Sequence, residues 1–150
     1  MIEQIDFSRN KSGYEQVLAH LNECDADFVP PLNQRLAISV YAQKLIDRAV
    51  RFEAWYDTDL VGLTALYCND PSKSSAFITN VSVTPPWQGR GIAGLLLERC
   101  LDAMGELSFE TIELEVGQQN SAAIGLYKKY GFSLNHTNDQ SLVMTLVIGN

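Results

Sequence analysis

The sequence predicts a single α+β domain with a mixed, mostly antiparallel central sheet and helices on both faces. The first observation behind this prediction is the order of the hydrophobic periodicities, β-α-α-β-β-β-α-β-α-β-β. Strands follow one another directly in the first half of this order, whereas strand–helix–strand units occur only in the second half. The second observation is that 150 residues with 46% hydrophobic content are enough for one core, and no repeat or linker divides residues 1–150.

The first half of the chain is predicted to contain two helices and four strands. Ile2–Phe7 alternates like a short strand, and Ser12 is a suitable cap for a helix that runs to Leu21. Gln34–Val50 has apolar residues at helical spacing, and Asp57-Thr58-Asp59 is typical of a hairpin turn. The other three strands expected here are Arg51–Tyr56, Leu60–Asn69 and Ser75–Val83.

The second half is predicted to contain two helices and three strands. Gly91–Gly105 is the clearest helix, because apolar residues recur at every third or fourth position. Asn120–Tyr130 is a second helix, which Gly131 ends. The three strands are Ile112–Val116, Phe132–Asn138 and Ser141–Ile148.

The composition excludes several classes of function. A net charge of −7 and a pI near 4.7 leave no stripe of Lys and Arg to neutralise phosphates, so no nucleic-acid partner is expected. The cysteines, Cys24, Cys68 and Cys100, lie far apart and form no metal-binding or disulfide pattern. The first residues form neither a cationic leader nor an apolar run. We therefore expect a cytoplasmic protein without membrane contact or bound metal.

The strongest functional signal is a glycine turn, Val81–Gly94, where a strand gives way to a helix. The backbone amides of Gln88–Ala93 are expected to be free at the helix N-terminus, where the macrodipole also favours an anion. Gly89 and Gly91 carry no side chain that would keep a pyrophosphate away. Arg90 either adds a charge-assisted contact or faces solvent.

A dinucleotide-binding turn is an alternative interpretation of the same glycines. Gly89-x-Gly91-x-x-Gly94 fits that pattern, and Glu113 and Glu115 follow at roughly the 20-residue distance where an acid would meet a ribose. In such a turn, however, the first glycine follows the strand almost directly, whereas Thr84–Gln88 intervenes here. We therefore reject this alternative.

Two motifs resemble the GNAT (N-acetyltransferase) superfamily, and the resemblance covers about Leu60 to Phe132. Gln88–Ala93 is similar to the family's Q/R-x-x-G-x-G/A motif, with Ala93 as the permitted alternative to glycine. The strand Ile112–Val116 and the following Asn120–Phe132, which ends in Y-x-x-x-G-F, are similar to the family's second motif. The resemblance implies a GNAT-type sheet in which the strand ending at Val83 splays from the strand that begins near Ile112.

The resemblance implies an acyl-CoA-dependent N-acetyltransferase that binds acetyl-CoA and a primary amine together and transfers the acetyl group directly. The pantetheine arm would bond to exposed backbone groups of the splayed strand. Asn120 matches a CoA-contacting asparagine and is also a good helix N-cap. The residues that the resemblance assigns to cofactor binding are Val81, Ser82, Val83, Gln88, Gly89, Arg90, Gly91, Ile92, Ala93, Asn120 and Tyr127.

Two catalytic residues follow from the resemblance. Tyr127 occupies the position of the general acid that protonates the leaving CoA thiolate, or else packs against the sulfur. Glu115 resembles the base of ribosomal-protein N-terminal acetyltransferases. Alternatively, it holds the splayed strand or the Asn120 loop by hydrogen bonds, and a water carried by Thr79, Asn80 or Ser82 removes the proton. His20 and His136 stand outside both motifs, and no catalytic role is expected for them.

The acceptor is left open by the sequence. The family resemblance places its pocket near the acidic segment Glu23–Arg35 and near Phe132–Ser141, and amino sugars, amino acids, polyamines and peptide N-termini all fit. A homodimer is also possible. The strand Ser75–Val83 contains no Asp or Glu, which motivates a second hypothesis: a catalytically silent acyl-CoA-binding sensor or interaction module of the same fold.

Overall fold

The computed structural model describes residues 4–25, 37–68 and 74–148, and these form four helices and a seven-stranded sheet. The elements are β1 (Asp6–Arg9), α1 (Tyr14–Cys24), α2 (Ile38–Arg48), β2 (Val50–Tyr56), β3 (Asp59–Tyr67), β4 (Ser75–Val83), the 3-10 turn η4 (Pro85–Trp87), α3 (Ile92–Glu106), β5 (Thr111–Gly117), α4 (Ser121–Lys129), β6 (Ser133–Thr137) and β7 (Ser141–Val147). This order confirms the predicted succession of strands and helices.

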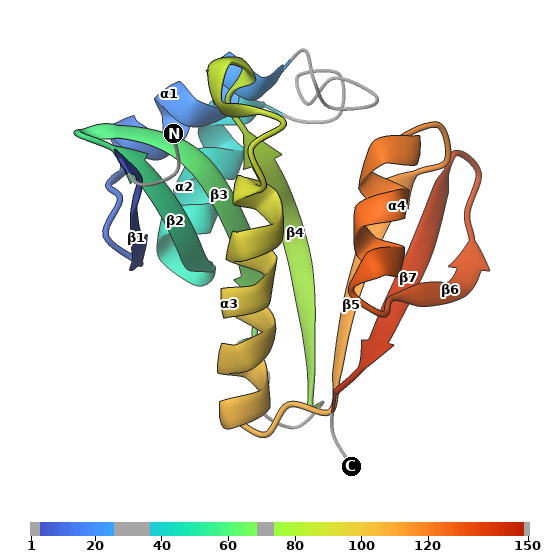
Figure 1. The fold of residues 1–150 in the computed structure, drawn as a ribbon. Coiled ribbons are helices and arrows are strands. Elements are labelled where there is room, and N and C mark those ends of the chain that lie inside the picture. Colours follow the sequence, from blue (N-terminus) through green and yellow to red (C-terminus); the bar gives the residue numbers. More distant parts are fainter. Residues whose placement is uncertain (1–3, 26–36, 69–73, 149–150) are drawn as a thin grey trace.

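The helices cover both faces of the sheet, as predicted. Figure 1 shows α3 and α4 on one face and α1 and α2 on the other. The first face encloses a core in which Leu96 and Cys100 of α3 pack with Ile78 and Ile112 of the sheet. A second core joins the helices α1 and α2 to buried side chains of β2 and β3. The sheet is therefore the middle layer of three.

The strands follow the order β1-β2-β3-β4-β5-β7-β6, and all neighbours are antiparallel except β4 and β5. Tyr56 pairs with Asp59, so the predicted hairpin turns through two residues, with Asp57 at a φ of +52°. The parallel pair β4/β5 is connected through α3, and it lies in the centre of the sheet.

The parallel pair separates after four residues, which confirms the predicted splay. Pairing runs from Ser75 opposite Thr111 to Ile78 opposite Leu114 and goes no further. In Figure 1 the two strands meet at the bottom and diverge toward the top. At the same level the partners of β3 jump from Asn80 to Ile78, so Thr79 forms a bulge. The upper part of β4 therefore exposes one edge.

The bulge is held from the α1/α2 face. The hydroxyl of Tyr41, on α2, lies 2.9 Å from the Thr79 carbonyl and 2.7 Å from the Thr79 hydroxyl. Beyond the bulge Asn80 and Ser82 are buried, and the Ser82 hydroxyl lies 2.8 Å from His20 of α1. The extra residue thus turns these polar side chains toward the α1/α2 face.

The predicted cap of the first helix is wrong. Gly13, not Ser12, is the N-cap residue of α1. Ser12 is buried and binds the Glu53 carboxylate through its amide, at 3.1 Å, and through its hydroxyl. Arg51 lies 3.5 Å from the same carboxylate. The Ser12 side chain, which the local sequence predicts as the cap of α1, therefore binds the distant Glu53 carboxylate instead.

Candidate active site

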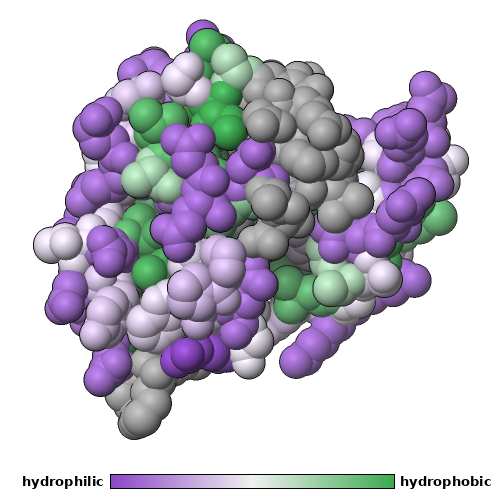
Figure 2. All heavy atoms as spheres, turned by 90° about the horizontal axis from the view of Figure 1, so that it is seen from above, coloured by the Kyte–Doolittle hydropathy of each residue, from purple (hydrophilic) through white to green (hydrophobic). Residues whose placement is uncertain are grey.

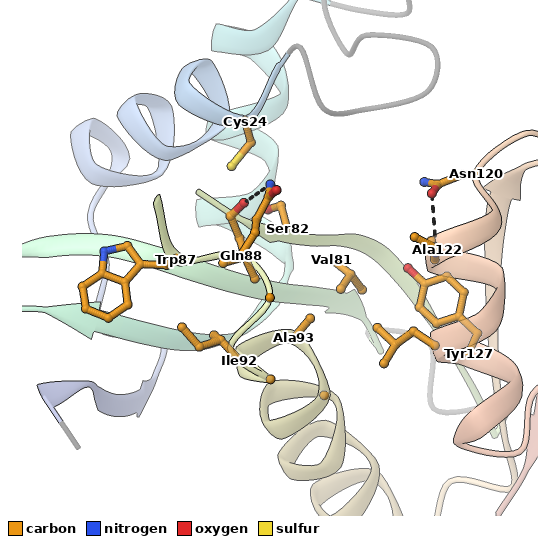
Figure 3. Close-up of a pocket in the computed structure, with 16 residues that line it drawn as sticks. Cys24, Val81, Ser82, Trp87, Gln88, Ile92, Ala93, Asn120, Ala122 and Tyr127 are labelled. Carbon is orange, nitrogen blue, oxygen red and sulfur yellow. Dashed lines mark hydrogen bonds between the residues drawn. The ribbon is translucent and has the colours of Figure 1, made fainter. Parts of the chain in front are cut away.

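The splay opens into a cavity of about 440 Å³ between β4, the glycine turn and α4. Figure 3 shows Val81 and Ser82 on one side of this cavity and Asn120 and Tyr127 on the other. In the view from above (Figure 2), hydrophobic residues are visible between the main body of the molecule and the lobe at the right, and the surface of this lobe is mostly polar. Apart from Arg90, every residue predicted to bind the cofactor lines this cavity.

The glycine turn presents a run of free amides to the cavity. The first backbone bond of α3 joins the Leu95 amide to the Gly91 carbonyl at 3.1 Å, and no acceptor is found for the amides of residues 89–94 among the described residues. The prediction began this run one residue too early, because the Gln88 amide donates to the Pro85 carbonyl at 3.3 Å. The 3-10 turn Pro85–Trp87 makes this bond.

Two glycines are required for the path of this turn. Gly89 has a φ of +77° and Gly91 a φ of +82°, a region that other residues reach only with strain. A Cβ atom added to either residue would meet nothing within 4 Å, so it would stand in open space. This space leaves room for a ligand close to the backbone. Gly94 is different, because its added Cβ would lie 2.8 Å from the Tyr130 hydroxyl. It serves the packing of α3 against α4.

Arg90 lies at the rim instead of in the cavity. Its guanidinium stacks on the Trp87 ring at 4.7 Å from the centroid and donates to the Pro86 carbonyl at 3.3 Å. Trp87 in turn contacts the ring of Tyr56 at 5.0 Å. This stack of side chains lies on the outer side of the turn, and the free amides lie on the inner side, toward the cavity.

The open edge of β4 offers a second set of backbone groups. The Thr84 amide donates to the Val61 carbonyl of β3 at 2.9 Å. Because backbone groups alternate sides along a strand, Ser82 also points its amide and carbonyl toward β3, while Val81 and Val83 point theirs into the gap. The Val83 carbonyl accepts a hydrogen bond from the side chain of Gln88 at 3.0 Å. An extended ligand arm can therefore pair with this edge like an added strand.

Tyr127 stands where the cavity meets a smaller pocket inside the splay. Its ring packs edge-on against Phe132, with centroids 5.9 Å apart. Burial raises the pKa of its phenol to about 12, so the hydroxyl keeps its proton at neutral pH. The described residues provide no hydrogen-bond partner for this hydroxyl. Asn120 caps α4 by accepting from the Ala123 amide at 3.3 Å, which confirms its predicted capping role.

Glu115 and Tyr127 line the same small pocket, together with Asn80. Glu115 lies on β5 beyond the last residue that pairs with β4. Its carboxylate accepts hydrogen bonds from Asn138, at 3.1 Å, and from Ser141. It therefore binds the connection between β6 and β7, a contact that the sequence did not predict, and it also lines the pocket that contains Tyr127.

The sequence analysis missed a group of buried polar residues beside the cavity. His20 is only 2% exposed, and its two ring nitrogens contact the Leu60 carbonyl at 2.9 Å and the Ser82 hydroxyl at 2.8 Å. Cys24, one helical turn after His20, lines the cavity and lies 3.7 Å from the same ring. A histidine on the buried face of an amphipathic helix was the only local signal of this arrangement.

The predicted acceptor segment, Glu23–Arg35, lies mostly outside the described residues. Phe132–Ser141 is described and forms β6 and its flanking turns, in which His136 is exposed and bonds to the neighbouring Asn135. Within residues 4–25, 37–68 and 74–148, the acidic and metal-binding side chains form no cluster that would hold a metal ion. No helix in these ranges is long and apolar enough to cross a membrane.

Comparisons with known proteins agree with this geometry. The acetyltransferase (GNAT) family matches residues 14–132. L-amino acid N-acetyltransferase AaaT of Escherichia coli is 32% identical over 102 residues, 65% of this chain and 63% of that protein. The ribosomal protein bS18-alanine N-acetyltransferase of Salmonella typhimurium is 40% identical over 58 residues, 39% of each chain. This chain therefore spans less than two thirds of the length of either relative.

Solved structures share the fold over almost the whole chain. The ribosomal-protein-S18-alanine N-acetyltransferase from Escherichia coli superposes with a TM-score of 0.77 at 22% identity, over 97% of this chain and 95% of that one. PaiA N-acetyltransferase from Thermoplasma acidophilum, crystallised with coenzyme A, gives a TM-score of 0.75 at 17% identity, over 95% and 99%. The splayed sheet, the glycine turn and the family match lead to one conclusion: the chain belongs to the acetyltransferase (GNAT) family.

Proposed function

We propose that the protein is an N-acetyltransferase that moves the acetyl group of acetyl-CoA to a primary amine while both substrates are bound. The observation that carries this proposal is the continuity of one cavity from the free amides of residues 89–94, along the open edge of β4, to the hydroxyl of Tyr127. The side chains of Cys24, Cys68 and Cys100 form no disulfide in the described part of the chain, which fits a reducing compartment such as the cytoplasm.

In this proposal the protein binds acetyl-CoA mainly through backbone amides and carbonyls. The amides of residues 89–94 and the N-terminal dipole of α3 bind the pyrophosphate, because both favour an anion. The Val81 and Val83 backbone groups pair with the pantetheine amides. The Val83 carbonyl accepts from the cofactor only if the side chain of Gln88 moves aside or shares it. Acetyl-CoA supplies the activated acetyl group.

Tyr127 acts at the leaving sulfur. A thiolate departs more readily when a donor reaches it, and a phenol with a pKa of about 12 keeps its proton for that purpose at neutral pH. Phe132 fixes the ring by edge-on packing. Replacement by Phe removes the donor and keeps the shape.

Glu115 acts on the amine. An ammonium group has no lone pair, so it must lose a proton before its nitrogen can attack. The Glu115 carboxylate faces the pocket that adjoins Tyr127, and the side chains of Asn138 and Ser141 hold it there. It binds the cationic amine and takes this first proton, directly or through water.

We assign the acceptor to the class of α-amines, either free amino acids or peptide N-termini. The supporting observation is that two relatives carry names for such acceptors, an L-amino acid and the alanine of a ribosomal protein. The carboxylate of Glu115 suits the cationic form of this acceptor.

Release of free CoA from acetyl-CoA, with L-amino acids, an Ala-starting peptide, glucosamine and spermidine as acceptors, tests the proposal. We expect Tyr127→Phe to lower kcat about 100-fold and to leave the Kd for acetyl-CoA unchanged. Tyr130→Phe is the matched control, because Tyr130 is not among the residues that line the cavity and its hydroxyl bonds to Glu98 at 3.2 Å. Unchanged turnover in Tyr127→Phe removes this residue from the mechanism. If the protein binds acetyl-CoA tightly but releases no CoA thiol with any acceptor, it is a catalytically silent acyl-CoA-binding module instead.

A further inference from the structure

His20 is a buried titratable residue to which the reaction described so far assigns no role. It lies on α1 between two hollows. On one side Ser82 and Cys24 line the cofactor cavity. On the other side His20 itself lines a surface groove, whose charged side chains are Glu15 and Glu23 of α1 and Asp59 of β3. The contact between His20 and Ser82, at 2.8 Å, connects the two.

The hydrogen-bond directions around His20 follow from the chemistry of its partners. A carbonyl oxygen only accepts, so Nδ1 must donate its proton to Leu60, 2.9 Å away. Burial lowers the pKa of the imidazole to about 4, so at neutral pH the ring is neutral and Nε2 carries a lone pair. Nε2 can therefore accept a hydrogen bond from the Ser82 hydroxyl, at 2.8 Å, or from the Cys24 thiol, at 3.7 Å, and the shorter contact favours Ser82. This leaves the lone pairs of the Ser82 oxygen available to other donors.

Asn80 completes the arrangement. The Ser82 hydroxyl lies 2.7 Å from the carboxamide oxygen of Asn80, an acceptor that competes with His20 for the one Ser82 proton. The relay requires the Asn80 carboxamide in the flipped orientation, in which its N–H group donates to the Ser82 oxygen. Asn80 also lines the small pocket that contains Glu115 and Tyr127. The chain of hydrogen bonds thus runs from the amine pocket, through Ser82, to His20.

An ammonium loses two protons on its way to an amide. The first leaves before attack, and it is the one assigned to Glu115. The second sits on the nitrogen while the bond to the acetyl carbon forms, and this bond makes it far more acidic. A weak base that stays neutral at physiological pH is suited to that second proton, and a strong base is not required.

We propose that Ser82 and His20 together take this second proton. As the C–N bond forms, the N–H bond of the amine breaks and its proton passes to the Ser82 oxygen. The original Ser82 proton passes at the same time to Nε2 of His20, and the electron pair of the broken N–H bond stays on the nitrogen. The imidazolium that results has both N–H groups bonded, to Leu60 and to Ser82, and it returns the proton on Nε2 through the Ser82 oxygen to the cavity once the product has left.

This inference rests on the proposed function, and part of its test needs no activity. In ¹⁵N-labelled protein at pH 7, we expect the His20 ring to show Nδ1 protonated and Nε2 unprotonated. A ring protonated at Nε2 overturns the relay, because Ser82 could then not donate to it. This result would leave the proposed function intact.

Kinetics with acetyl-CoA and the amine that the wild type acetylates fastest test the transfer itself. His20→Asn keeps a donor for Leu60 but removes the acceptor for Ser82, and His20→Gln supplies an acceptor that cannot take up a proton. We expect both variants, and Ser82→Ala, to lower kcat about 100-fold with the Kd for acetyl-CoA unchanged. Ser82→Thr restores a hydroxyl and should recover about 10-fold of that loss.

The outcomes separate the hypotheses. If His20→Gln has the turnover of the wild type, His20 only orients Ser82, and its role as proton acceptor is overturned. If the His20 variants do not fold, the pair Ser82→Ala and Ser82→Thr still decides, since equal turnover in both variants overturns the relay. A wild type that releases no thiol with any amine overturns the proposed function and the relay together.

Discussion

Replacing Gly91 with Ala tests the glycine turn most sharply, because the structure separates its effect on stability from its effect on binding. Gly91 is the N-cap residue of α3 at a φ of +82°. An Ala in the left-handed region costs about 1–2 kcal/mol, which is roughly 2–8 °C in Tm for a chain of this length. The new Cβ meets no atom within 4 Å, so no steric cost is added in the free protein.

The loss of affinity has a different origin. The backbone strain is present with and without ligand, so it cancels in the Kd. The Cβ, in contrast, stands in the space above the free amides and displaces the pyrophosphate from at least one of them. A hydrogen bond to a charged group contributes about 1.5–3 kcal/mol. This predicts a Kd for CoA raised roughly 10- to 150-fold.

Isothermal titration with CoA and thermal unfolding measure the two effects. Gly105→Ala is the matched control: Gly105 lies in the last turn of the same helix, without positive φ and with open space at its Cβ. Ala there should keep the Kd and stabilise the helix by up to about 1 kcal/mol. A Gly91→Ala protein that is destabilised as expected but binds CoA as the wild type does would refute the assignment of these amides to the pyrophosphate.

Three further predictions concern the core and pH. Gly62→Ala should destabilise by about 1–3 kcal/mol in chemical unfolding, because its Cβ would lie 2.8 Å from a side-chain carbon of Ile92 where α3 crosses β3. Glu53→Gln should cost about 3–5 kcal/mol by leaving Arg51 unpaired in the interior; a loss below 1 kcal/mol would contradict this. His20, whose folded pKa of about 4 lies below its usual 6.5, makes stability fall as the pH decreases from 6.5 to 4. His20→Asn should remove up to about 3 kcal/mol of that decrease, and identical pH dependence in both proteins would contradict it.

The features predicted well from sequence are those with short-range causes. Asn120 caps α4 because its own side chain reaches an amide three residues on. Gly89 and Gly91 adopt positive φ because the turn between β4 and α3 requires it locally. The strand β4 was predicted to the residue, because the polar sequence Asp70–Ser74 precedes it and Pro85 follows it.

The features missed have long-range causes. Ser12 is drawn away from the helix end by Glu53, 41 positions along the chain. His20 acquires its partner Ser82 from 62 positions away, across the sheet. The bulge at Thr79, which turns Ser82 toward that histidine, leaves no mark in the strand's composition. Neither periodicity nor spacing reports such contacts, since they depend on how the layers pack.

The most direct test of the account is an NMR titration of ¹⁵N-labelled protein with acetyl-CoA. The account predicts that the largest amide shifts fall on residues 89–94, on Val81 and Val83, and on Asn120. The amide signals of β1, which lies at the edge of the sheet, should stay unchanged. Shifts confined to other elements, or none at saturating acetyl-CoA, would contradict the placement of the cofactor between β4 and α4.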